Sequence, residues 1–225
     1  MRNYRILSSK SQSLKHIYAP CLLTFLIYFL TFFPQTVDSM GYTDTLVHIA
    51  AAKEMFSGTA PTIFMQYPVF FALAALFGKL FLNYSLGTSV LIGLMAALTC
   101  SLQIKFLSYF FFHNCSKLKI AVYGFALGFI WPLNLAGCGS PTELYLLSGA
   151  TAPFHNATYL TSKPFALICF CLFYILLAPV TGENLHQLCQ NTKRENRILL
   201  FFAAFFFISV LAKPNFYQIF ARRAF

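Results

Sequence analysis

The sequence predicts an all-α protein whose helices cross a membrane several times. Of its 225 residues, 58% are hydrophobic, only 10% are charged and 28 are Phe, so the chain cannot present a water-soluble surface. Its net charge of +10 is concentrated in short segments between apolar runs. This pattern sets membrane topology and is not typical of a nucleic-acid surface. We therefore expect a multi-pass integral membrane protein that contacts membrane lipids and binds no nucleic acid.

The first element is an apolar run over residues 17–33, preceded by a basic segment, residues 1–16. The basic side chains of that segment are Arg2, Arg5, Lys10 and Lys15. A basic segment followed by an apolar run is either a signal peptide or a first transmembrane helix. The run is long and aromatic, no small-residue cleavage pair follows it, and further apolar runs continue along the chain. We favour the helix and expect residues 1–16 to lie in the cytoplasm.

The number of spanning helices follows from charge. The apolar runs are 17–33, 63–82, 86–112, 119–137, 164–180 and 198–212. If all six crossed the membrane, the basic residues Lys117, Lys119, Lys193, Arg194 and Arg197 would lie outside, against the rule that basic loops stay in the cytoplasm. If the second run lies along the outer surface instead, all of these residues return to the cytoplasm.

The second run also favours a surface position by itself, because it is short and carries Lys79 near one end. The sequence therefore predicts about five spanning helices and two external juxtamembrane helices. It places external loops at about 35–85 and 138–163.

The first of the two external helices is expected within GYTDTLVHIAAAKEMFSG, residues 41–58. Thr43 suits the N-cap, Asp44 suits the first turn, where the helix dipole favours an anion, and Gly58 suits the stop. The expected helix covers about 44–57.

Asp44 and His48 share one face of this helix because they are four residues apart. Ala51 and Ala52 lie beyond them and are expected to leave open space, so a carboxylate and an imidazole would stand over a floor of small residues. The alternative is that Asp44 only charges the helix N-terminus and His48 is an interfacial polar residue.

Three segments in order carry a resemblance to a known class: TDTLVHIAAAKEM, QYPVFFALAALFGKLF and GSPTELYLLSGATAPFHNATYLTSKPFAL. Following a basic N-terminus and one span, they resemble the N-terminal module of the GT-C class of polytopic glycosyltransferases, and most nearly bacterial membrane proteins of surface-polysaccharide synthesis. The resemblance extends over about residues 17–218 and rests on the order of the elements. It implies transfer of a sugar from a polyprenyl-phosphate carrier to a glycan acceptor at the outer face of a bacterial plasma membrane.

The resemblance also implies roles for the acidic residues. In this class the aspartate of the first external loop acts on the acceptor hydroxyl, which transfers onto Asp44, with Asp38 second because it lies closer to the first span. The class often has another acid in its second external loop, where this chain offers only Glu143. Whether a divalent metal ion is a cofactor is therefore left open.

Sugar transfer from a lipid phosphate needs a general base and hydrogen-bond donors around the departing phosphate. The donors on the external loops are His48, His155, Asn156 and Lys163, with Lys213 as a secondary candidate at the end of the last span. The alternative for His155 and Asn156 is a polar turn before a helix. Lys163 and Lys213 each precede a proline at the edge of an apolar run, so each also suits an interfacial anchor.

The last segment, LAKPNFYQIF, reads like the start of another external segment, and residues 219–225 form a short tail. Members of the class continue for about as many spans again, so the sequence is expected to be an N-terminal fragment.

The alternative function is a non-enzymatic polytopic protein, such as a transporter half or an assembly subunit. A transporter is expected to bury charge at mid-membrane depth, whereas the acids and histidines here gather in loops.

Overall fold

The computed structural model describes residues 15–37, 45–55, 68–110, 115–129, 157–181 and 192–212. Within these ranges it contains α-helices and no strands, which confirms the all-α class for this part of the chain. The helices are α1 (Lys15–Val37), α2 (Thr45–Glu54), α3 (Pro68–Leu80), α4 (Tyr84–Phe110), α5 (Lys117–Phe129), α7 (Ala157–Thr181) and α9 (Thr192–Ala212).

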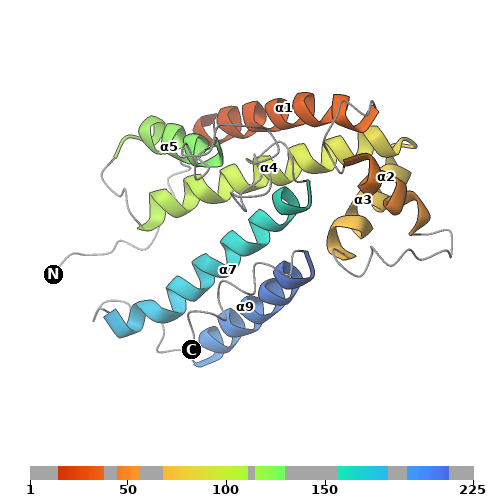
Figure 1. Ribbon diagram of the computed structural model, residues 1–225. Coiled ribbons are helices and arrows are strands. Elements are labelled where there is room, and N and C mark those ends of the chain that lie inside the picture. The colour runs from red at the N-terminus through yellow and green to blue at the C-terminus, as the bar shows by residue number, and fades with distance from the viewer. Residues whose placement is uncertain are drawn as a thin grey trace, which may run out of the picture.

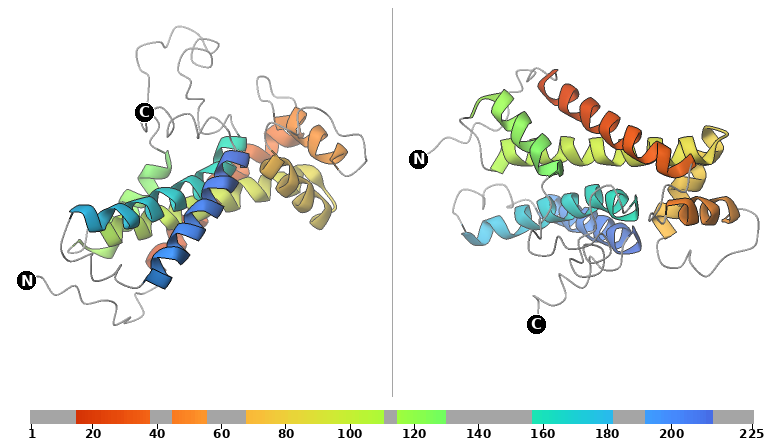
Figure 2. Two further views of the ribbon diagram at one scale, coloured as in Figure 1. Left: turned by 90° about the horizontal axis from the view of Figure 1, so that it is seen from below. Right: turned by 45° about the horizontal axis from the view of Figure 1, so that its top comes forward.

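The helices form two packed pairs with smaller elements at either end (Figures 1 and 2). Helices α1 and α4 lie side by side, and α7 and α9 form the second pair. Helix α4 is the centre of the bundle, because it contacts both α1 and α7. Helix α5 packs against α1 and α4 at one end, while α2 and α3 lie at the opposite end.

Polar contacts show that α1 and α4 are antiparallel. Thr36, near the end of α1, meets Ser85 and Ser89 at the start of α4. The Ser85 hydroxyl donates to the Thr36 carbonyl oxygen at 2.8 Å, and the Thr36 and Ser89 hydroxyl oxygens are 3.3 Å apart. These hydroxyls join the two helices where α1 ends and α4 begins.

Aromatic contacts fix the direction of the second pair. The rings of Phe106 in α4 and Phe170 in α7 are 5.6 Å apart between centroids, so the second half of α7 lies beside the end of α4. The rings of Phe173 and Phe202 are 6.1 Å apart, which brings the first half of α9 beside the second half of α7. Helix α7 thus runs parallel to α4, and α9 runs back again (Figure 1).

The bundle therefore has two distinct ends. The basic end holds the start of α1, the end of α4, the start of α5, the end of α7 and the start of α9, and it carries Lys117, Lys119 and Arg197, all exposed. The α2–α3 end holds α2, α3, the end of α1, and the starts of α4 and α7, together with the end of α9 (Figure 2).

Two helices in the described part of the chain are long and apolar enough to cross a membrane, namely His16–Val37 and Tyr84–Phe110. This is fewer than the five predicted. The described part of α5 has 13 residues, and the apolar segments of α7 and α9, Leu160–Ile175 and Asn196–Leu211, are shorter than 18 residues. Helix α3 also has 13 residues, about 20 Å at 1.5 Å per residue, against a hydrocarbon core of about 30 Å.

Most of α1 faces outward. Only 17% of its apolar window is buried, against 44% for α4. Its exposed large side chains are Tyr18, Leu22, Leu23, Leu26, Leu30, Phe33 and Val37. A continuous apolar face of this length is unfavourable in water and suits a lipid environment. Helix α1 therefore does not have the burial of a core helix in a soluble protein.

Candidate functional site

A single hydrophobic cluster joins five helices at the α2–α3 end. Helix α2 begins at Thr45, directly after Asp44, and covers most of the predicted range 44–57. Its buried alanines belong to the same cluster as residues of α1, α3, α4 and the start of α7. The main members are Phe32, Ala51, Ala52, Phe70, Phe71, Ala74, Leu91, Ile92, Ala157 and Leu160. The start of α7 therefore packs into the same core as the helix that follows Asp44.

The predicted open floor beneath Asp44 and His48 is wrong. Ala52 is fully buried and Ala51 is 5% exposed, because the aromatic side chains of α3 fill the space beside them. The imidazole of His48 lies against the same side chains, with its ring centroid 5.6 Å from those of both Phe70 and Phe71. His48 is therefore half-buried and held by aromatic rings.

The first turns of α7 are polar yet buried. The helix begins at Ala157, directly after Asn156 and well before the predicted apolar run 164–180. The hydroxyl of Thr161 donates to the carbonyl oxygen of Ala157 at 3.1 Å, which lets a hydroxyl-bearing residue sit within a buried helix. Thr158, Thr161 and Ser162 are all buried, and Lys163 is half-buried in the next position.

The α2–α3 end also carries buried oxygen atoms with no hydrogen-bond partner among the described residues. They are Gln35 Oε1 near the end of α1, Thr45 Oγ1 at the start of α2, Thr88 Oγ1 near the start of α4 and Ser209 Oγ in the last turn of α9. A buried polar group without a partner costs about 1–3 kcal/mol, so each of these atoms calls for an explanation, such as a bound water, an ion or a functional role. Four helix ends thus present unused hydrogen-bonding capacity in one region.

The structure describes two of the predicted site residues, His48 and Lys163. The others, Asp38, Asp44, Glu143, His155, Asn156 and Lys213, lie outside the described residues. Three of them are nevertheless next in sequence to a described helix end: Asp44 precedes α2, Asn156 precedes α7 and Lys213 follows α9. All three of these helix ends belong to the α2–α3 end of the bundle.

Sequence reasoning missed Gln35, Thr45, Thr88 and Ser209. Polar residues within apolar runs were the available signal, but a hydroxyl in a helix usually bonds to its own backbone. Thr24 does so, donating to the Pro20 carbonyl oxygen at 2.8 Å. Which hydroxyls lack such a bond depends on side-chain rotamers and packing, which the sequence alone does not reveal.

The described residues contain no group of three or more His, Cys, Asp or Glu side chains able to hold a metal ion. The carboxylates that the sequence proposes for this role, Asp38, Asp44 and Glu143, lie outside those residues.

No protein-family model matches the chain, and no curated protein or solved structure matches it.

Proposed function

We propose that the chain acts as a GT-C-type membrane glycosyltransferase, which transfers a sugar from a polyprenyl-phosphate carrier to a glycan acceptor at the outer face of a bacterial plasma membrane. The observation that supports this proposal is that several helix ends lie at the same end of the bundle. The helix ends next to Asp44, Asn156 and Lys213 share one end of the bundle, where buried oxygen atoms lack partners. A glycan rich in hydroxyl groups is a ligand that such atoms suit.

The topology proposed with this function has five spanning helices and a cytoplasmic N-terminus. The directions of the helices support it: α1, α5 and α9 run toward the α2–α3 end, whereas α4 and α7 run away from it, so successive spanning helices alternate in direction. Lys117, Lys119 and Arg197 are exposed at the opposite end, as the positive-inside rule expects of a cytoplasmic face, whereas the α2–α3 end carries the exposed lysines Lys53 and Lys79. The α2–α3 end is then the outer one.

In this scheme Asp44 is the general base that accepts the proton of the acceptor hydroxyl. His48, held against Phe70 and Phe71, has a fixed ring from which to donate to the phosphate or the sugar. Lys163 supplies positive charge for the departing phosphate, together with His155 and Asn156 just before α7. Thr45 Oγ1 and Thr88 Oγ1 are buried at the same end of the bundle and have no hydrogen-bond partner among the described residues.

The test is the substitution Asp44→Asn, which keeps the size of the side chain but removes its ability to accept a proton. Loss of a general base typically costs about 100- to 10,000-fold in rate, while the level of inserted protein should hardly change. The measurement is lipid-linked sugar or glycan formed per unit of inserted protein.

Asp38→Asn is the matched control and is expected to have a much smaller effect. Full activity of Asp44→Asn combined with loss of activity in Asp38→Asn would move the base to Asp38. If neither substitution lowers sugar transfer, the glycosyltransferase proposal fails.

If the chain were part of a transporter, charged side chains would be expected at mid-membrane depth, where transporters bind their substrates and coupling ions. The described part of α1 beyond Lys15 has no Asp, Glu, Lys or Arg, and α4 has only Lys105, which is exposed and lies toward the basic end. The two long helices therefore favour a site at the membrane surface over a transport path.

A further inference from the structure

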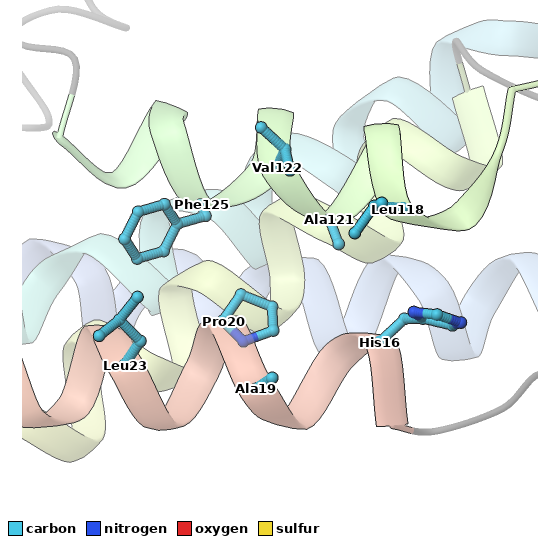
Figure 3. Close-up of a pocket in the computed structure, with 8 residues that line it drawn as sticks. All are labelled: His16, Ala19, Pro20, Leu23, Leu118, Ala121, Val122 and Phe125. Carbon is cyan, nitrogen blue, oxygen red and sulfur yellow. The ribbon is translucent and has the colours of Figure 1, made fainter.

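A groove lies between the first half of α1 and the facing side of α5, far from the α2–α3 end (Figure 3). Its volume is about 290 Å³. It is lined by His16, Ala19, Pro20, Leu23, Leu118, Ala121, Val122 and Phe125. All of these except His16 are apolar, so the groove suits a hydrocarbon chain.

The groove is polar at one mouth only. His16 and Leu118 lie together at that mouth, and Leu23 and Phe125 lie at the other end, with Pro20 between them (Figure 3). The neighbours of Leu118 in the sequence, Lys117 and Lys119, are both exposed. Because these two lysines flank a lining residue, they bring positive charge near this mouth. An apolar groove with positive charge near one mouth suits an amphiphile with an anionic head.

We infer that this groove binds an anionic phospholipid, with one acyl chain along Pro20, Leu23 and Phe125 and the head-group phosphate near His16, Lys117 and Lys119. The positive charge near the groove mouth favours an anionic lipid over a zwitterionic one. Basic side chains beside membrane helices on the cytoplasmic side recognise anionic head groups, whereas a zwitterionic lipid gains nothing from them.

The chain's own N-terminal segment is a poor occupant for the mouth. Residues 1–14 carry Arg2, Arg5 and Lys10 and no acidic residue, so they add positive charge beside His16 and do not neutralise it. An anionic lipid is therefore favoured over this segment.

The first experiment is native mass spectrometry of the full chain in detergent, titrated with palmitoyl-oleoyl phosphatidylglycerol or with the matching phosphatidylcholine. The wild type should bind phosphatidylglycerol more tightly. Each basic side chain near an anionic head group raises the affinity for the lipid about fivefold. Lys117→Gln/Lys119→Gln should therefore weaken phosphatidylglycerol binding about 25-fold and leave phosphatidylcholine binding unchanged. The matched control, Lys53→Gln/Lys79→Gln at the α2–α3 end, should leave both lipids bound as in the wild type.

The second experiment fills the groove. Val122→Trp should abolish saturable phosphatidylglycerol binding and leave the core undisturbed, because Val122 is 54% exposed. Leu76→Trp on α3, where Leu76 is 57% exposed, is the control and should bind as the wild type does. Leu118→Trp, at the basic mouth, is a second filling variant should Val122→Trp fail to insert.

Three results would overturn the inference: equal wild-type affinity for the two lipids, unchanged phosphatidylglycerol binding in Lys117→Gln/Lys119→Gln, or unchanged binding in the filled variants. The last of these would assign the preference to surface charge alone. The variants that test the groove, Lys117→Gln/Lys119→Gln, Val122→Trp and Leu118→Trp, all lie in α5 and leave α2 and Asp44 unchanged, so this test is independent of the proposed glycosyltransferase activity.

Discussion

Thr88 and Thr99 are buried threonines of the same helix that differ in one hydrogen bond. The Thr99 hydroxyl donates to the Met95 carbonyl oxygen at 2.8 Å, whereas Thr88 Oγ1 has no partner among the described residues. Thr88→Val is therefore expected to keep or raise thermal stability in detergent, because it removes an unsatisfied polar group at nearly constant shape. If Thr88 serves a substrate, the same variant should lower sugar transfer.

Thr99→Val is the control, expected to lose about 0.5–1.5 kcal/mol of stability with its hydrogen bond. Melting temperature and sugar transfer per inserted protein are measured for both variants. A Thr88→Val protein that is clearly destabilised, or that is stable and fully active, would remove Thr88 from the site.

At the scale of single residues, the sequence predicted which side chains share a face of a helix but not what covers that face. The spacing of Asp44, His48 and the two alanines depends only on helical geometry. Burial of Ala51 and Ala52 depends on Phe70 and Phe71, which come from another helix. The open floor was predicted wrongly for that reason.

The connection between α3 and α4, residues 81–83, is described in full by the structure. Leu82 has φ 52°, a left-handed conformation, and it allows Asn83 N–H to donate to the Gly78 carbonyl oxygen at 3.1 Å. Asn83 Oδ1 then accepts from the Leu86 N–H at 3.0 Å and caps α4. Leu82 is 93% exposed, which suits an anchor at a membrane surface.

Gly87 allows α4 to lie against α3 at this connection. A Cβ at Gly87 would come 2.6 Å from the backbone carbon and oxygen of Phe77, atoms that cannot rotate away. Gly87→Ala is therefore expected to cost about 1–3 kcal/mol, the usual range for overpacking. The measurement is thermal unfolding of the purified chain in detergent.

The control is Gly128→Ala in α5, where the nearest atom to an added Cβ is Gln103 Oε1 at 3.8 Å. This variant should be neutral or gain up to about 1 kcal/mol, since glycine weakens a helix interior. Equal stability of the two variants would mean that α3 does not pack closely on α4.

At the scale of elements, the apolar runs predicted most helices to within a few residues, because helices in an apolar chain follow its apolar segments. Two helices begin well before their predicted runs: α9 begins at Thr192 instead of 198, and α7 begins at Ala157 instead of 164. The first turns of α7 contain Thr158, Thr161 and Ser162, which looked like a polar loop before the run 164–180. Their burial against the α2–α3 end is a tertiary effect that periodicity does not reveal.

At the scale of the whole molecule, charge predicted five spans, while the described part contains two helices long enough to cross a membrane. The sequence could assign basic segments to one side, since that rule depends only on local charge. It could not predict that the starts of α2 and α7 share one hydrophobic cluster, because that contact joins segments about a hundred residues apart.

The central claim is that the basic end and the α2–α3 end lie on opposite sides of a membrane, with the proposed site outside. Cys115 is exposed at the basic end, and Lys79 is exposed on α3. The measurement is labelling by a membrane-impermeant maleimide in intact cells. One variant keeps Cys115 as its only cysteine, and the other has Lys79→Cys as its only cysteine. The cysteine of Lys79→Cys should react in intact cells, and Cys115 should react only after permeabilisation. Reaction of Cys115 in intact cells would contradict the claim, whether or not the cysteine of Lys79→Cys also reacts.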